Sequence, residues 1–255
     1  MVAPPSKPKD FFTGIGMLGK GIGMYARSPG LILLGMLPAL LAFVVLVVAF
    51  VLVVSFLRPE ARALTWFANG WATDARELVR ILAMVAIVGL SVYLSVVVFT
   101  ALTLLIGDPF YERISQRVED RLGGAPGTAN PPFLREMTRA SVDAIGMAVF
   151  SALVGVVLFV GGLLPGVGQT VVPVVSAFVA GWVLTLELTG VPFSRRGMSR
   201  LRQRRKVLGR YRWLTLGFGV AVFVCFLIPF GAVLLMPAAV IGATLLTRHV
   251  HGLST

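Results

Sequence analysis

The sequence predicts an all-α integral membrane protein, and two observations carry this prediction. The chain has 255 residues, of which 57% are apolar and only 13% are charged, whereas a soluble domain has about 25% charged residues. Two uncharged runs, residues 31–57 and 81–106, each exceed the roughly 20 residues that a helix needs to cross a bilayer. We expect two full transmembrane helices, two partly inserted helical hairpins with Pro/Gly tips, and an N-terminal interfacial helix.

The start of the chain predicts a helix that lies in the membrane interface. Residues 1–10 are polar and contain prolines, so we expect them to be disordered. Apolar side chains then recur at alternating spacings of four and three, at Phe11, Ile15, Leu18, Ile22 and Tyr25. This spacing places one apolar stripe on a helix over residues 11–27, with glycines and Lys20 on its other faces. Such a helix directly before a spanning segment is expected to lie flat at the interface.

The two long apolar runs are expected to cross the membrane. Residues 31–57 begin too late for a cleaved signal peptide, and no small-residue cleavage site follows them. We therefore interpret them as a retained signal-anchor, and residues 81–106 as the second span. The loop between them carries Trp66 and Trp71, which are typical anchors at a membrane–water interface.

A soluble-looking segment, residues 107–140, follows the second span and is expected on the cytoplasmic side. It opens with Asp108 and Pro109, which predict the N-cap and the first residue of a new helix. A short charged helix over residues 111–122 follows, and two glycines then end it. Asp108 is therefore expected to be a helix cap rather than an acid with a chemical role.

Two pairs of apolar runs, residues 142–188 and 213–246, are each interrupted by an uncharged Pro/Gly turn. Each arm of the second pair has about 15 residues, roughly 22 Å of helix against a hydrocarbon core of about 30 Å. We expect that pair to dip into the membrane and return, while the first pair could either cross or dip. A bend at membrane depth cannot face lipid, because its unpaired backbone groups would each cost several kcal/mol. The turns therefore predict an oligomer with a polar permeation route.

The distribution of charge predicts that both termini lie in the cytoplasm. Either arrangement of the hairpins gives an even number of crossings, so the termini, the segment 107–140 and the basic segment 189–212 share one side. That side holds 19 of the 23 Lys and Arg residues, and the positive-inside rule makes it the cytoplasmic side. Residues 11–248 then form a single membrane domain, and residues 249–255 form a short tail.

Five motifs resemble a known family in their order along the chain. They are "DPFYERISQRVEDRLGG" (108–124), "LPGVGQTVVPV" (164–174), "LGFG" (216–219), "IPF" (228–230) and "MPAAVIGATLL" (236–246). The set is similar to the CysZ sulfate permeases and the etoposide-induced membrane proteins, from about Phe11 to Arg248. The residues that carry the family's structural marks are Asp108, Pro109, Phe110, Pro165, Gly166, Gly168, Gly217, Gly219, Pro229, Pro237 and Gly242.

The resemblance implies a multi-pass protein of the bacterial inner membrane that assembles as a homo-oligomer. It also implies sulfate uptake that feeds cysteine biosynthesis, without ATP or a bound cofactor. Sulfate-transporting members resemble one another in a Gly-(Leu/Ile)-Arg stretch before the first span, where this chain has Gly30, Leu31 and Ile32. The arginine is missing, and Arg27, three residues before that glycine, is the candidate substitute.

Arg27, Ser28 and Gly30 are the candidate anion-binding residues. A guanidinium offers forked donors, and a serine offers a hydroxyl. The start of the following helix adds free N–H groups and a favourable dipole. The alternative is an interfacial arginine whose side chain reaches lipid phosphate.

Three further polar side chains lie at or near the first hairpin. Gln169 and Thr170, at its tip, either line a pore or satisfy the turn's own backbone. Glu187, the only acid in a long apolar run, marks either an ion pathway or a local ion pair with the arginines that follow it. The basic segment 189–212 either contacts anionic lipids or gathers anions near a cytoplasmic mouth.

Other classes of function find little support in the sequence. The single Cys225 excludes an internal disulfide, and the two histidines of the tail have no third ligand nearby, so no metal site is expected. No nucleotide-binding pattern, nucleophile with a base, or nucleic-acid recognition motif is present. We therefore expect an oligomeric anion transporter rather than an enzyme. The alternative is a non-transporting membrane scaffold or envelope-assembly protein of the same fold.

Overall fold

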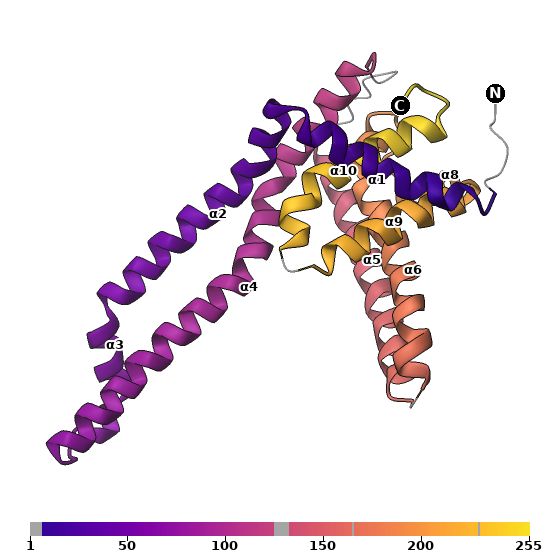
Figure 1. Cartoon of the computed structure of the whole chain (residues 1–255). Helices are drawn as coiled ribbons and strands as arrows, with labels where there is room; N and C mark the ends of the chain where they lie inside the picture. The colour runs from indigo at the N-terminus through magenta and orange to yellow at the C-terminus, as the bar shows by residue number, and fades with distance from the viewer. Residues whose placement is uncertain (1–6, 125–132, 165, 229) are drawn as a thin grey trace. The chain divides into compact units, whose positions relative to one another are not determined.

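The computed structural model describes residues 7–124, 133–164, 166–228 and 230–255, with the backbone alone at 133–145 and 167. All regular structure in these residues is helical (Figure 1). The chain divides into two compact units. Met36–Phe110 is called the arm unit here, and Met1–Gly35 with Tyr111–Thr255 is called the core unit.

The arm unit contains most of the two helices that the sequence predicts as full spans. Helix α2 (Pro29–Ser55) enters it, the short helices α3 (Leu57–Leu64) and η1 (Trp66–Ala68) follow, and α4 (Thr73–Arg121) leaves it. Both α2 and α4 are long and apolar enough to cross a bilayer. Only 11% of the most apolar window of α2 is buried within the chain, and 0% of that of α4. Their apolar surfaces therefore remain for lipid or for partner chains.

Helix α4 corrects the prediction that a new helix begins after the second span. It continues for 49 residues, with Pro109 inside it, so the span and the charged helix are one element. A proline within a helix removes one backbone hydrogen bond. Ending one helix and starting another would instead leave four C=O and four N–H groups without helical partners. Asp108 is therefore exposed on the side of a continuous helix and is not an N-cap.

In the core unit the first hairpin consists of α5 (Phe133–Gly162) and α6 (Val167–Leu188). Gly166 has a φ of +83°, a conformation that favours glycine, and this reverses the chain between the two helices. A Cβ on Gly168 would overlap the backbone of Gly162, so the close approach of the helix ends also needs glycine. The sequence predicts the second arm from residue 171, but α6 begins earlier and includes Gln169 and Thr170.

After the first hairpin the core unit continues with α7 (Gly190–Ser194), α8 (Leu201–Arg210), α9 (Arg212–Phe226) and α10 (Gly231–Val250). The basic helix α8 and the apolar helix α9 meet at a bend of 106°. Helix α9 has the expected 15 residues.

Helix α10 is longer than the arm of about 15 residues that the sequence predicts. It has 20 residues and is long enough to span, although 78% of its most apolar window is buried inside the chain. It continues past the apolar run because its last polar side chains have partners. Thr247 donates to Ala243 O (2.8 Å), and Arg248 pairs with Glu119 (2.6 Å).

Glycines set the crossings between the helices of the core unit. Helix α1 (Asp10–Ala26) packs on α9 and α10, and α6 packs on α9. At each crossing a glycine lies so close to the partner helix that an added Cβ would overlap the backbone of that helix. These glycines are Gly14 and Gly217 between α1 and α9, Gly21 between α1 and α10, and Gly181 and Gly219 between α6 and α9. Small residues let helices approach closely, as in membrane helix pairs generally.

The face of α1 that packs within the core unit is not its apolar stripe. The face buried against α9 and α10 consists of Gly14, Met17, Leu18 and Gly21. Of the five residues in the predicted stripe only Leu18 belongs to it, and Ile15 is 39% exposed. Backbone contact at the glycines brings the helices closer than bulky side chains would allow, so the glycine face is the buried one.

Candidate functional site

The predicted anion-binding turn joins α1 to α2. Ser28 is buried, at 7% exposure, while Arg27 is exposed. The carbonyl of Ser28 accepts hydrogen bonds from the backbone N–H groups of Leu31 (2.9 Å) and Ile32 (3.0 Å), so it closes the first turn of α2. The positive end of the α2 dipole therefore lies at this turn.

Two arginines that the sequence interpretation did not single out reach the same turn from α4. Nη1 of Arg121 donates to the hydroxyl of Ser28 (2.7 Å), and Nη1 of Arg117 donates to the carbonyl of Gly30 (3.2 Å). The two residues are four apart, so they lie on one face of α4. The sequence shows this spacing. It does not show that the two arginines contact the turn at Ser28–Gly30, which lies 93 and 87 residues earlier in the chain. The structure thus brings Arg117 and Arg121 to the turn that follows Arg27.

A cavity of about 610 Å³ adjoins this turn. Its lining includes Lys20, Arg27, Ser28, Leu245 and Thr255. No Asp or Glu side chain lies among its described lining residues. The cavity therefore offers cations, hydroxyls and a helix N-terminus, which together favour an anion.

The polar side chains predicted at the first hairpin do not form one site. Thr170 donates to the carbonyl of Gly166 (2.6 Å), so its hydroxyl satisfies the turn. Gln169 is exposed beside it, and Glu187 is exposed near the opposite end of α6. The rise along a helix separates the two ends by roughly 26 Å. Any joint role of these residues would need a further chain.

Four of the residues that carry the family's marks are in packing positions. Gly217, Gly219, Pro237 and Gly242 are buried in α9 and α10. A Cβ on Gly35 would lie 2.6 Å from Cγ of Pro237, so the start of α2 packs on α10. The remaining marks are Asp108, Pro109 and Phe110 in α4, Gly166 and Gly168 at the first hairpin, and Pro165 and Pro229, which lie outside the described residues.

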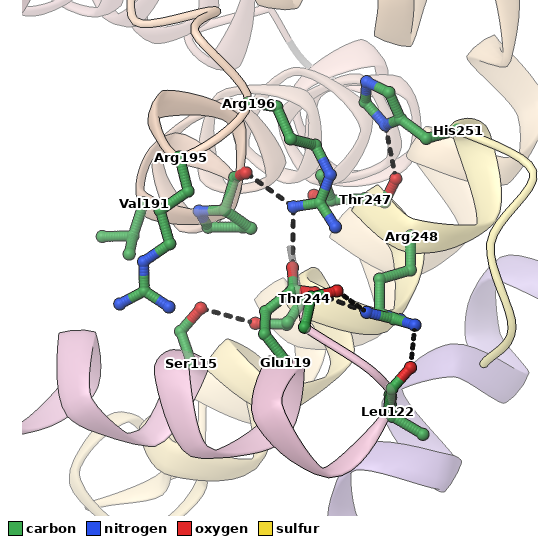
Figure 2. A network of polar contacts seen from close by, with 12 residues as sticks. Ser115, Glu119, Leu122, Val191, Arg195, Arg196, Thr244, Thr247, Arg248 and His251 are labelled. Carbon is green, nitrogen blue, oxygen red and sulfur yellow. Dashed lines mark hydrogen bonds and ion pairs between the residues drawn. The ribbon is translucent and has the colours of Figure 1, made fainter. Parts of the chain in front are cut away.

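A second cluster of charged side chains is buried in the core unit (Figure 2). Glu119 of α4 is 1% exposed and lies between two arginines. Its Oε1 is 2.7 Å from Nη1 of Arg196, and its Oε2 is 2.6 Å from Nη1 of Arg248. The side chains of both arginines are 3% exposed. Arg196, one of the arginines that follow Glu187 in the sequence, contacts Glu119.

The two arginines differ in how their donors are used. Arg248 donates to Glu119, and also to backbone carbonyls of Leu122, Gly124 (3.0 Å) and Ser254 (2.8 Å). Arg196 uses only Nη1, which donates to the carbonyl of Pro192 (2.7 Å) and approaches Glu119 without the alignment of a hydrogen bond. Its Nε and Nη2 are buried and have no hydrogen-bond partner among the described residues.

His251 borders this cluster at the end of α10 (Figure 2). Its Nδ1 lies 2.7 Å from the carbonyl of Thr247, and its ring meets that of Phe193 edge-on at 5.3 Å between centroids. Burial lowers the pKa of His251 below its ordinary value of 6.5, and the charge of Arg196 lowers it further. The bond to Thr247 and the charge of Glu119 act in the opposite direction.

These features define a class of protein. Four described helices are long and apolar enough to cross a membrane, and a fifth span results if α8 and α9 are taken together. The protein is therefore a multi-pass, all-helical membrane protein.

The comparisons with known proteins then give the family. The chain belongs to the family described as "Sulfate transporter CysZ/Etoposide-induced protein 2.4", whose model matches residues 17–237. This confirms the resemblance found in the sequence, and the family is one of transporters rather than enzymes. One relative is "Sulfate transporter CysZ" of Pectobacterium atrosepticum, 28% identical over 150 residues. The match covers 57% of this chain and 54% of that protein, so it spans about half of the relative's length.

Proposed function

We propose that this chain is an anion transporter of the bacterial inner membrane and that its anion is sulfate, taken up for cysteine biosynthesis. The family and the name of the Pectobacterium relative support the substrate. The observation that carries the proposal is the turn at Ser28–Gly30, where Arg117 and Arg121 donate from α4. These arginines supply the positive charge that the missing arginine of the Gly-(Leu/Ile)-Arg stretch would bring.

Sulfate would enter the cavity beside Arg27 and bind at the start of α2. A guanidinium has five donors, and Arg117 and Arg121 each have one hydrogen bond to this turn, so further donors remain for an anion. Arg27 and Lys20 line the cavity and would draw a dianion towards it. Arg27 lines the cavity and is exposed to solvent. Binding of sulfate would therefore stay weak enough for release.

The proposed topology has α2 and α4 as full spans and both hairpins partly inserted, with both termini in the cytoplasm. Helix α9, with 15 residues, has a length of roughly 22 Å and is short for a crossing. The chain would work as a homo-oligomer, in which the nearly unburied spans and the hairpin tip with Gln169 and Thr170 meet other copies. Glu187 would then lie near a shared pathway.

Anionic lipids are the proposed contact of the basic segment 189–212. Four basic side chains of α8 are exposed, at Arg202, Arg205, Lys206 and Arg210. Leu208, on the other side of α8, is buried. A helix with one buried and one basic face suits a membrane surface that carries negative charge.

Flux of labelled sulfate into proteoliposomes tests the function. We expect saturable flux from the wild type and a loss of about tenfold or more in the Arg117→Gln/Arg121→Gln variant, because charge-assisted donors dominate anion binding. Arg113→Gln is the matched control, since Arg113 is exposed on the same helix one turn earlier. Arg27→Ala reports separately on the exposed arginine.

The alternative function is a non-transporting scaffold or envelope-assembly protein of the same fold. The sequence Gly30-Leu31-Ile32, which lacks the arginine, favours it. Folded, oligomeric wild-type protein without flux above empty liposomes would contradict the transport proposal and support this alternative.

A further inference from the structure

We infer that the buried edge of Arg196, within its cluster with Glu119 and Arg248, is a binding site for a small monovalent inorganic anion. This site is separate from the turn at Ser28–Gly30 and does not depend on sulfate transport. It lies within the core unit, at the junction of the ends of α4 and α10 with the turn after α7 (Figure 2).

Among the described residues, the charges of this cluster do not balance. Two buried arginines face one buried glutamate, so the three side chains carry a net charge of +1. The neighbouring His251 adds no negative charge in either protonation state. Burying a charge without a partner is strongly unfavourable. One monovalent anion would neutralise the cluster.

The unused donors of Arg196 lie on one edge of its guanidinium group. Nε and Nη2 form one edge of a guanidinium, and their N–H groups point in parallel. This is the edge that binds two oxygens of an oxyanion at once. In Arg196 both atoms of this edge are buried and find no hydrogen-bond partner in the described part of the chain, and the side chain is 3% exposed.

The acceptors near Arg196 are already engaged by donors other than its Nε and Nη2. The carbonyl of Pro192 already accepts from Nη1 of Arg196, and the carbonyl of Thr247 lies 2.7 Å from Nδ1 of His251. Both oxygens of Glu119 lie closest to Nη1 atoms rather than to the free edge. A neutral water could accept from the edge but would leave the charge of +1 uncompensated. An anion satisfies both requirements.

The test is the thermal unfolding of the full chain, purified in detergent, as nitrate replaces gluconate at constant ionic strength. Nitrate is the probe because it is monovalent and planar, and gluconate is too bulky for a buried site. A ligand that binds only the folded state raises the Tm in a saturable way. We expect this rise in the wild type, in Arg195→Gln and in Arg117→Gln/Arg121→Gln, but not in Arg196→Gln.

Arg195 is the matched control because it is the adjacent residue and its Nη2 donates to the carbonyl of Glu112 at an exposed position (3.0 Å). A response that persists in Arg117→Gln/Arg121→Gln belongs to this cluster and not to the proposed transport site. A response lost in that double variant and kept in Arg196→Gln would overturn the inference.

Glu119→Gln should strengthen nitrate binding, whereas a variant that merely loses structure would weaken it. It raises the net charge of the cluster from +1 to +2, so we expect nitrate to bind about tenfold more tightly while the Tm without nitrate falls. Weaker binding in this variant, or no saturable nitrate response in the wild type up to about 100 mM, would show that the cluster is only an internal ion-pair network.

Discussion

Glu119 and Arg248 are 129 residues apart in the sequence, and Nη1 of Arg248 donates to Oε2 of Glu119 over 2.6 Å within the interior of the core unit. This contact joins the end of α4 to the end of α10. Arg248 also donates hydrogen bonds to the carbonyls of Leu122 and Gly124, after α4, and of Ser254, in the tail. One side chain therefore joins two parts of the chain that the sequence leaves far apart, residues 119–124 and 248–254.

Replacing Arg248 by Met should destabilise the core unit strongly. The change leaves Glu119 with one buried partner and removes the donors to three carbonyls, so we expect a loss of about 3–5 kcal/mol in the free energy of unfolding. Chemical unfolding in detergent measures it. Glu77→Gln is the control, because Glu77 is 58% exposed in its pair with Arg80 (3.7 Å). That exposed pair should contribute less than about 1 kcal/mol, and equal losses in both variants would contradict the prediction.

Two glycines of α1 should respond to alanine in opposite ways. A Cβ on Gly14 would overlap the backbone of Leu214, whereas a Cβ on Gly16 meets nothing within 4 Å. Gly14→Ala should therefore destabilise by about 1–3 kcal/mol through overpacking. Gly16→Ala should be neutral or stabilise by up to about 1 kcal/mol, since alanine is the better helix former. If both variants unfold alike, α1 does not pack on α9 by its glycine face.

The stability of the core unit should decrease as the pH falls below the ordinary pKa of His251, 6.5. The folded state holds the pKa of His251 lower than this, so the unfolded chain binds a proton that the folded chain resists. Stability is then complete above 6.5 and is lost as the pH falls from 6.5 through the lower, folded pKa. His251→Gln should remove this part of the pH dependence. Unfolding measured from about pH 8 to about pH 5 tests it, and an unchanged profile in the variant would count against the prediction.

Asp108→Ala should leave stability unchanged within about 0.5 kcal/mol, as is usual for exposed positions. Asp108 lies within the continuous helix α4 and caps no helix end. Removing a true N-cap would instead cost about 1 kcal/mol. Circular dichroism during unfolding distinguishes the two values, and a loss of the larger size would restore the helix break that the sequence suggested.

The sequence was sufficient for the features that depend on length and composition. Residues 31–57 and 81–106 predict the long apolar helices that α2 and α4 form, because an uncharged run of that length is itself the signal. The buried face of α1 could not be predicted from apolar spacing, since the glycines that form it become an interface only when α9 and α10 are in place.

The charged cluster was missed because Glu119, Arg196 and Arg248 share no local spacing. One signal was nevertheless present in the sequence. The buried face of this end of α4 consists of Tyr111, Ile114, Ser115, Val118 and Glu119, which recur at helical spacing. An acid that continues an apolar stripe must find a cation in the interior. Arg117 and Arg121 lie on another face of α4, and their spacing is likewise visible in the sequence. Their contact with the turn at Ser28–Gly30 is not.

The close contacts between helix backbones in the core unit also affect how far related sequences can diverge while they keep the same fold. At the contacts of Gly14, Gly181 and Gly219 the neighbouring helix meets main-chain atoms, which every amino acid shares. Surrounding side chains can then be exchanged without altering the distance between the helices. Two chains that agree at few positions would keep the same helix arrangement so long as those glycines persist. Distant homologues of this chain should therefore be easier to find from the positions of their glycines than from overall identity.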